Sequence, residues 1–348
     1  ISCPCALSLS IPAALAVAHG ALARIGVLAL RPDALETLAD VTDVVFDKTG
    51  TLSDGRPRRA AVETVDGFDP QVALRIAAAL ERDSGHPLAH AFADVEDAPE
   101  ASDVRAVPGA GIEGVVDGVA WRFGQAGFAC GGEDDGNLWL GDGRRGVARF
   151  GIRESARAEA AEAIAALRGL GVRMHLSSGD SAEAVARFGK ALEIEDVHAR
   201  QTPEQKLAFV RGLQAEGRRV AMVGDGLNDA PVLAGADVSL AVADGAALAQ
   251  RAADLVATHP SLMRVPESIV LARRTRRIIR QNLAWALGYN VLALPLAAAG
   301  LVTPWLAALG MAASSLTVTL NALRLAPRQK PQPRPAAAMM AAAPSPAD

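Results

Sequence analysis

The clearest chemical signal in this sequence is an aspartate that directly follows a short apolar run. Val44–Phe46 is apolar, and the residues DKTGT follow at positions 47–51. Such a run predicts a buried parallel strand, and ligands of open α/β sheets bind just outside the carboxyl ends of strands. Asp47 could therefore attack a phosphorus atom and form an aspartyl-phosphate. Lys48 would neutralise phosphoryl oxygens, and a turn at Gly50 would let backbone amides approach them. An ordinary polar turn is the weaker alternative.

A second strand end also carries acids. Val220–Val223 predicts a strand, and GDGLNDAP follows at 224–231. Asp225 and Asp229 lie four residues apart across a tight turn, so both can face one hard cation. Mg²⁺ prefers one or two carboxylates with water and phosphate oxygens. A structural turn would explain the glycines but not two acids at a second strand end, and we therefore predict a magnesium site.

Two further segments could handle a phosphoryl group. A strand predicted over 172–176 ends in Ser177-Ser178-Gly179-Asp180. A hydroxyl and a glycine in this place can donate hydrogen bonds to phosphoryl oxygens. Pro203 begins a predicted helix that carries Lys206, which by itself would be an ordinary surface lysine.

The first 23 residues carry no formally charged side chain and are long enough to form a membrane helix. Pro4 stands between Cys3 and Cys5, and proline leaves helix carbonyls without their usual partners. Two thiols beside such a break suit a soft metal ion, above all Cu(I). A cysteine that merely packs as a small apolar residue is the alternative, and the pair makes it less favoured.

The length, charge and apolar stretches of the chain indicate which domains and helices must position these residues. The chain has 348 residues, a hydrophobic fraction of 50% and a formal net charge of −4. It has room for two or three domains, and the charge gives no case for nucleic-acid binding. Residues 283–301 and 305–323 carry no formal charge, and arginines cluster at 273–280, so we predict a membrane hairpin with both outer ends in the cytoplasm.

Polar residues inside that hairpin are costly in lipid and are candidates for function. They are Tyr289 and Asn290 in the first stretch, and Met311, a soft sulfur ligand, with Ser314-Ser315 in the second. Helix packing explains the serines equally well.

Residues 56–149 alternate Ala-rich helical stretches with glycine-rich strand-like pieces, which predicts an inserted domain. Glu81, Ser84 and His86 lie in ERDSGHP, and Gly109 and Gly111 follow downstream. By itself, His-Pro is more often a structural helix-start turn.

Taken together, the motifs over about residues 1–325 resemble the C-terminal portion of heavy-metal P-type ATPases, most closely the copper-selective branch. The segment Pro304–Met311 is most similar to the subgroup linked to cytochrome oxidase assembly. The resemblance implies an α/β, haloacid-dehalogenase-like Rossmannoid phosphorylation domain with an inserted α+β nucleotide-binding domain and transmembrane helices. The expected parts are a Cys-Pro-Cys helix (1–31), a phosphorylation domain (32–55 and 150–260), a nucleotide-binding domain (56–149), a hairpin with a basic lead-in (261–325) and a disordered tail (326–348).

The resemblance also implies roles for individual residues. Catalysis would fall to Asp47, Lys48, Thr49, Ser178 and Lys206. ATP would contact Glu81, Ser84, His86, Gly109, Gly111, Gly179 and Asp180. Mg²⁺ would be held by Asp47, Thr49, Asp225 and Asp229. The transported Cu(I) would be held by Cys3, Cys5, Tyr289, Asn290, Met311 and Ser315. In two places the chain departs from the family: Glu154 replaces the usual aspartate, and no Gly-Asn pair is evident near Gly124-Gln125.

The implied setting is a bacterial-type inner membrane with cytoplasmic catalytic domains, and the implied partners are the bilayer, ATP and a copper chaperone. The alternatives are a P-type pump for another ion, such as Zn²⁺ or K⁺, and a soluble phosphatase of the haloacid dehalogenase type. Such phosphatases usually place an acid two residues after the nucleophile, where this chain has Thr49. Because no Thr-Gly-Glu motif, Cys-x-x-Cys domain or earlier membrane helix is found, we expect this stretch to bind ATP and autophosphorylate without completing a transport cycle.

Overall fold

The structure is a computed structural model that describes residues 5–82, 84, 87–107, 109–133, 135–225, 229–242 and 253–326. The chain divides into two compact units. One comprises residues 1–21 and 274–348, and the other comprises residues 22–273.

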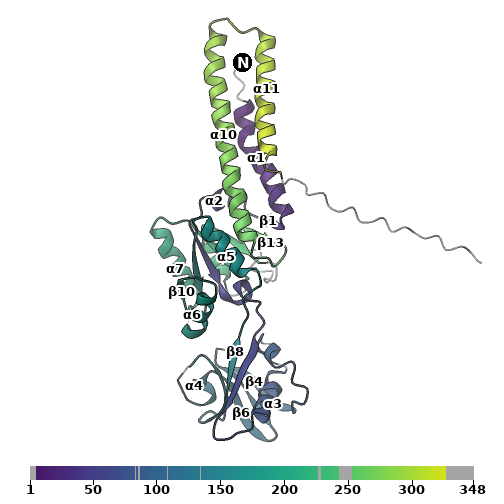
Figure 1. Cartoon of the computed structure of the whole chain (residues 1–348), viewed down its shortest axis with the longest axis vertical. Helices are drawn as coiled ribbons and strands as arrows, with labels where there is room; N and C mark the ends of the chain where they lie inside the picture. Colours follow the sequence, from purple (N-terminus) through teal and green to yellow (C-terminus); the bar gives the residue numbers. More distant parts are fainter. Residues whose placement is uncertain are drawn as a thin grey trace, which may run out of the picture. The chain divides into compact units, whose positions relative to one another are not determined.

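The first unit is helical. Its helices, which run side by side in Figure 1, are α1 (Cys5–Arg24), the later part of α10 (Arg264–Ala298) and α11 (Pro304–Leu323). Two segments, Ala6–Arg24 and Pro304–Leu323, are long and apolar enough to cross a membrane. The span predicted over 283–301 is not among them, and it stays a prediction. The basic lead-in at 273–280 is not a separate element, because α10 begins at Arg264.

Small residues bring these helices together. Ala6, Ala286 and Val318 form a buried cluster with one residue from each helix. In contrast, leucines along α10 and α11 remain exposed, with Leu292 at 71% and Leu309 at 60%. Small residues inside and large apolar residues outside are the pattern of helices that pack against each other in lipid.

The second unit contains a seven-stranded sheet with the order β1-β13-β12-β11-β2-β9-β10. All neighbouring strands are parallel except β1, which pairs with β13 antiparallel at the edge. The central strands are buried on both faces, as their continuous apolar runs predict. The strands are β1 (Val27–Ala29), β2 (Asp43–Asp47), β9 (Arg173–Ser177), β10 (Asp196–His198), β11 (Val220–Gly224), β12 (Val238–Ala241) and β13 (Leu255–Ala257).

Short helices accompany this sheet. They are α2 (Ala34–Leu38), α5 (Ala160–Gly169), α6 (Ala182–Ala191), α7 (Pro203–Ala215) and α8 (Ala230–Gly235). Helix α7 begins at a capping box in which the Thr202 hydroxyl accepts from the Gln205 amide and the Gln205 side chain accepts from the Thr202 amide. Val210 of this helix packs with Val45 and Met222 of the sheet. This packing fixes the first turn of α7 relative to β2.

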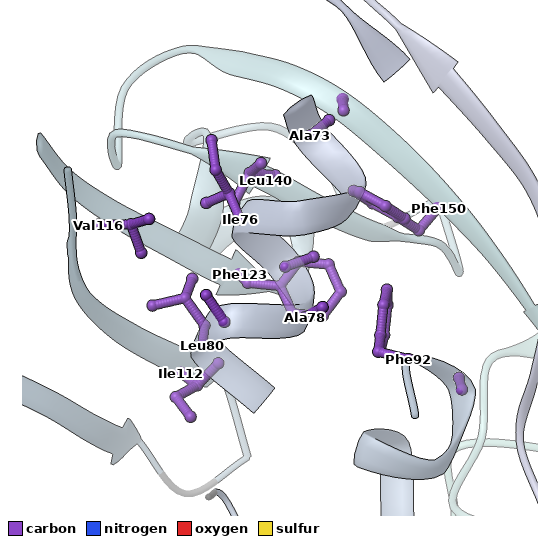
Figure 2. Close-up of a cluster of buried hydrophobic side chains, with 14 residues drawn as sticks. Ala73, Ile76, Ala78, Leu80, Phe92, Ile112, Val116, Phe123, Leu140 and Phe150 are labelled. Carbon is purple, nitrogen blue, oxygen red and sulfur yellow. The ribbon is translucent and has the colours of Figure 1, made fainter. Parts of the chain in front are cut away.

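A six-stranded antiparallel sheet lies between β2 and β9 in the sequence, with the order β3-β8-β7-β6-β5-β4. Phe92, Phe123 and Phe150 point toward one another in its core (Figure 2), with ring centroids 5.2–5.8 Å apart in edge-on contacts. The elements are β3 (Arg58–Thr64), α3 (Pro70–Glu81), η2 (Pro87–Ala91), β4 (Ala101–Val107), β5 (Gly111–Val116), β6 (Val119–Gly124), α4 (Ala126–Ala129), β7 (Leu138–Gly141) and β8 (Gly146–Arg153).

The inserted segment leaves and returns through adjacent positions. Strands β3 and β8 pair with each other, and Arg58 lies opposite Arg153. The Asp54 amide donates to the Ser155 carbonyl at 3.0 Å, and the Arg157 amide donates to the Leu52 carbonyl at 2.9 Å. The segment after β8 is therefore hydrogen-bonded to the residues that follow Asp47.

Candidate active site at the end of strand β2

Asp47 is the last residue of β2, and its carboxylate is buried, with 6% of the residue exposed. The Lys206 ammonium, from the first turns of α7, donates to Asp47 Oδ1 at 2.5 Å and to Asp229 Oδ1 at 2.9 Å. Asp229 immediately precedes α8 and is 2% exposed. The structure therefore brings together three of the residues that the sequence assigned to phosphoryl transfer and magnesium binding.

The charges of this cluster do not balance. Burial, with repulsion from Asp229, raises the pKa of Asp47 to about 7. Burial and Asp229 also raise the pKa of Asp225. Burial alone would lower the pKa of Lys206, but its attraction to Asp47 and Asp229 outweighs that effect and raises it. Three acids thus share the Lys206 ammonium and the more distant Arg157 guanidinium, so one negative charge is left over and the site favours an additional cation.

Gly50 allows Asp225 to join the cluster. Its φ of +69° is left-handed, and a Cβ at this position would lie 1.9 Å from Asp225 Oδ2. Asp47, Asp225 and Asp229 each offer a ligand oxygen, and these oxygens lie within 4.8 Å of one another. Hard carboxylate oxygens with an excess of negative charge are the donor set that Mg²⁺ takes. The residues present therefore fit the predicted magnesium site.

Lys48 does not join Asp47. Its ammonium forms ion pairs with Asp180 and with Glu154 Oε2, the latter at 3.1 Å, and its side chain is 7% exposed. Burial by itself would lower the pKa of Lys48, but Asp180 and Glu154 raise it. Ser178 follows β9 and is buried, and its hydroxyl accepts from the Asp180 amide at 3.2 Å. Lys48 and Ser178 are thus linked through Asp180.

Arg157 is a residue of this site that the sequence analysis missed. Its guanidinium donates to the Gly50 carbonyl at 2.6 Å and to the Thr51 carbonyl at 2.9 Å. These contacts fix two backbone carbonyls of the loop that follows Asp47. Arg157 lies about a hundred residues from this loop, and the one local signal was its position three residues after Glu154.

The residues predicted to bind ATP come from both sheets. Glu81 ends α3, is 4% exposed and accepts from the Ser84 hydroxyl at 2.6 Å.

Gly109 lies in a left-handed turn, with a φ of +71°. Gly111 lies opposite Gly124, and a Cβ on Gly111 would lie 2.3 Å from the Phe123 carbonyl oxygen, which explains the glycine through strand packing. Gly179 and Asp180 instead follow β9, and His86 lies outside the described residues.

The copper residues remain a prediction. Cys3 lies outside the described residues, as does the side chain of Cys5 at the start of α1. Tyr289 faces α11, because a Cβ on Gly310 would lie 2.8 Å from its hydroxyl. The Asn290 side chain donates to the Ala286 carbonyl of its own helix at 2.7 Å. Met311 and Ser315 on α11 are partly exposed, whereas the neighbouring Ser314 is 2% exposed and accepts from Trp285 Nε1 at 3.2 Å.

The order of the strands, the buried Asp47 at the end of β2 and the lysine on α7 together define a class of protein. A family profile described as haloacid dehalogenase-like hydrolase matches residues 44–237. The chain belongs to this family. Within it, the expected relationship to copper-type P-type ATPases is confirmed by its homologues.

Two curated relatives and one solved structure show the extent of the similarity. The nitrogen fixation protein FixI of Rhizobium leguminosarum bv. viciae is 43% identical over 93% of this chain and 44% of its own length. The probable copper-transporting ATPase SynA of Synechococcus sp. is 40% identical over 92% of this chain and 43% of its own length. The crystal structure of a zinc-transporting PIB-type ATPase in the E2.Pi state is 36% identical, with a TM-score of 0.76 over 93% of this chain and 56% of that one.

This chain therefore spans less than half the length of the two curated relatives. SynA is described as a probable copper-transporting ATPase, and two helices of this chain are apolar and long enough to cross a membrane. The membrane location predicted from the sequence is confirmed.

Proposed function

We propose that this chain is the catalytic and C-terminal membrane part of a pump that transports Cu(I) at the expense of ATP through an aspartyl-phosphate on Asp47. The observation that carries the proposal is the buried group of Asp47, Lys206 and Asp229, joined by contacts of 2.5 and 2.9 Å at the end of a central parallel strand. A buried carboxylate beside an ammonium, with further acids that suit a divalent cation, is an arrangement for attack on a phosphoryl group.

In this mechanism one Asp47 carboxylate oxygen attacks the γ-phosphorus of ATP. The new O–P bond forms as the bond from the γ-phosphorus to the bridging oxygen breaks, and ADP leaves with that electron pair. Lys206 neutralises charge at the Asp47 oxygen that it already contacts. Mg²⁺, held by Asp47, Asp225 and the Thr49 carbonyl with Asp229 close by, would offset the charge on the phosphoryl oxygens.

Thr49 favours a pump over a phosphatase. A phosphatase of this family usually has a second acid at this position, where it activates the water that hydrolyses the aspartyl-phosphate. Threonine cannot act as that general base at neutral pH, so the phosphoenzyme should persist. A persistent phosphoenzyme is what a pump needs, because transport requires time for a conformational change.

The test is the formation of a phosphoenzyme from ATP labelled in the γ-phosphate, using the whole chain in detergent. We expect a hydroxylamine-labile label that Asp47→Asn abolishes and that Asp97→Asn, at an exposed position of the inserted domain, leaves in place. A label that persists in Asp47→Asn would sink the assignment. Rapid release of free phosphate from the wild-type chain would favour the phosphatase.

Copper rather than zinc is proposed from the soft donors Cys3, Cys5 and Met311. It is supported by the similarity to SynA, a probable copper-transporting ATPase, while the similarity to the structure of a zinc-transporting ATPase supports Zn²⁺ as the alternative cargo. Competition with chelators should show Cu(I) bound more tightly than Zn²⁺, with a loss of Cu(I) binding in Cys5→Ser. The reverse preference would overturn the copper assignment and leave the phosphoenzyme chemistry standing.

A further inference from the structure

Glu154 is a carboxylate near the site to which the sequence analysis gave no role. It follows β8, where the chain returns from the inserted sheet, and its side chain is 15% exposed. A single oxygen, Oε2, lies 3.1 Å from the Lys48 ammonium and accepts from the Ser53 hydroxyl at 2.7 Å. One carboxylate oxygen thus touches both ends of the six-residue loop, 48–53, that follows Asp47.

The contact with Ser53 reaches the backbone of that loop. Ser53 is fully buried, and its oxygen accepts from the Gly50 amide at 3.3 Å and from the Gly55 amide at 3.4 Å. A hydroxyl has one proton, so donation to Glu154 directs the lone pairs of Ser53 toward these amides. Glu154 therefore fixes the rotation of the Ser53 hydroxyl and, through it, the position of the Gly50 amide.

The contact with Lys48 is one of two ion pairs, and the two differ. Asp180, the other partner of Lys48, is 37% exposed and lies on the segment after β9. Glu154 is less exposed and is held in place by Ser53. An incoming phosphate group can compete with the more exposed carboxylate of Asp180, while the less exposed Glu154 keeps its ion pair with the Lys48 ammonium.

We propose that Glu154 is a positioning residue for phosphoryl transfer, with one carboxylate oxygen that fixes both the Lys48 ammonium and the Gly50 amide relative to Asp47. This role rests on the proposed function. Glu154 does not contact Asp47 and acts through Lys48 and Ser53. Asp180 is the partner of Lys48 that gives way when the triphosphate enters.

The test measures the time course of phosphoenzyme formation by the whole chain over a range of ATP concentrations. Glu154→Gln keeps the size of the side chain but removes the charge. It should slow phosphorylation at saturating ATP by roughly 10- to 100-fold, the range expected when charge-assisted hydrogen bonds are weakened. The ATP concentration for half-maximal rate should change less than about threefold, because the loss concerns positioning rather than uniform binding.

Three further variants separate this role from a structural one. Glu154→Asp keeps the charge and should recover part of the rate, and Ser53→Ala should slow phosphorylation less than Glu154→Gln because Lys48 keeps its anchor. Asp180→Asn should change mainly the ATP concentration that is needed. Glu162→Gln, at an exposed position of α5, is the matched control and should behave as wild type.

Wild-type rates for Glu154→Gln at saturating ATP would overturn the proposal. So would a slowing that only follows a lower melting temperature and that Glu154→Asp does not relieve. A wild-type chain that forms no aspartyl-phosphate would instead refute the proposed function itself, and the role of Glu154 with it.

Discussion

The two ends of strand β2 each carry a buried aspartate, and their surroundings are opposite. Asp43 and Asp47 are 0% and 6% exposed, and they lie four residues apart, so both side chains point to the same face of the sheet. In the described part of the chain, Asp47 accepts from Lys206 alone. Asp43 is surrounded by donors from four residues: Thr42, Arg173, His175 and Arg218.

The pKa values follow from these neighbours. Burial alone would raise the pKa of both carboxyls. At Asp43 the hydrogen bonds from Thr42, His175 and the arginines outweigh burial and lower the pKa. At Asp47 burial and the repulsion from Asp229 win over Lys206 and raise it to about 7. The charge of the aspartate at the amino end of β2 is therefore balanced by protein groups, whereas the acids at the carboxyl end need a ligand to balance theirs.

Among variants that keep the Asp47 carboxylate, the largest expected effect is that of Gly50→Ala, which alters only the carboxyl end of β2. The added Cβ would lie 1.9 Å from Asp225 Oδ2, so the loop or the carboxylate must move. Displacements of this size at a reacting centre cost on the order of a hundredfold in rate or more, which phosphoenzyme formation would report. Gly67→Ala is the matched control, because Gly67 has a similar φ of +76° but nothing within 4 Å of its Cβ. Equal losses in both variants would point to backbone strain instead.

Asp43→Asn should destabilise the fold by about 2 kcal/mol, because it weakens the charge-assisted hydrogen bonds that the Asp43 carboxylate accepts from His175, Arg173 and Arg218. Thermal unfolding of the detergent-solubilised chain measures the loss. Lys48, Lys206 and the acids of the site are unchanged, so any protein that remains folded should form phosphoenzyme normally. A variant as stable as wild type would show that the amino end is not held by these ion pairs.

Asp47→Asn should have the opposite effect on stability. It removes a buried carboxylate from a cluster of like charges, and with divalent cations chelated it should raise the melting temperature by roughly 2–4 °C. Mg²⁺ should stabilise wild type more than this variant, because the variant has lost one ligand. A lower melting temperature in Asp47→Asn would contradict the excess of negative charge inferred for this end.

The pH dependence of these two stability differences should separate the ends further. With cations chelated, wild type should lose stability relative to Asp47→Asn as the pH rises from about 4 to about 7, because the folded state keeps its proton longer than the unfolded state. The advantage of wild type over Asp43→Asn should be full above the ordinary value of 3.8 and shrink below it, since the folded carboxyl stays ionised to lower pH. If both stability differences from wild type changed with pH in the same way, the contrast between the two ends of β2 would be wrong.

The smallest expected effect is that of Ser177→Ala. Ser177 pairs with Asp47 across the sheet and is fully buried, and its hydroxyl has no hydrogen-bond partner among the described residues. Removing an unsatisfied hydroxyl should change stability by less than about 1 kcal/mol and leave phosphorylation within about threefold. Ser178→Ala should slow phosphorylation more, because Ser178 contacts the Asp180 backbone. A large loss in Ser177→Ala would show that the carboxyl end uses this hydroxyl.

The sequence predicted the carboxyl end of β2 better than the amino end. Asp47 and Asp225 follow apolar runs that predict strands, and the order of motifs along the chain located Lys206. It gave no sign of the Asp43–His175 contact or of Arg157 on the Gly50 carbonyl, because these partners lie more than a hundred residues apart. Lys48 was expected to contact the phosphoryl group. The direction of its side chain depends on ion pairs with Glu154 and Asp180, which lie far from it in the sequence and come close only in the folded chain.

In the helical unit, the sequence did not predict which side of each helix faces its neighbours. Ser314 and Ser315 are equal as a sequence pattern, yet only Ser314 is buried between helices. A one-residue step turns a side chain by about 100° around the helix, so small differences in packing decide which serine faces inward.

The contact between the two ends of the inserted segment affects which changes of sequence the chain can tolerate. Asp54 and Ser155 are hydrogen-bonded neighbours, so the segment between them begins and ends at nearly the same point. An inserted segment whose ends meet can be lengthened, shortened or exchanged at little cost in loop-closure entropy, because the pairing of the strands in the seven-stranded sheet stays the same. The catalytic sheet can thus keep one chemistry while the segment that it carries is free to diversify.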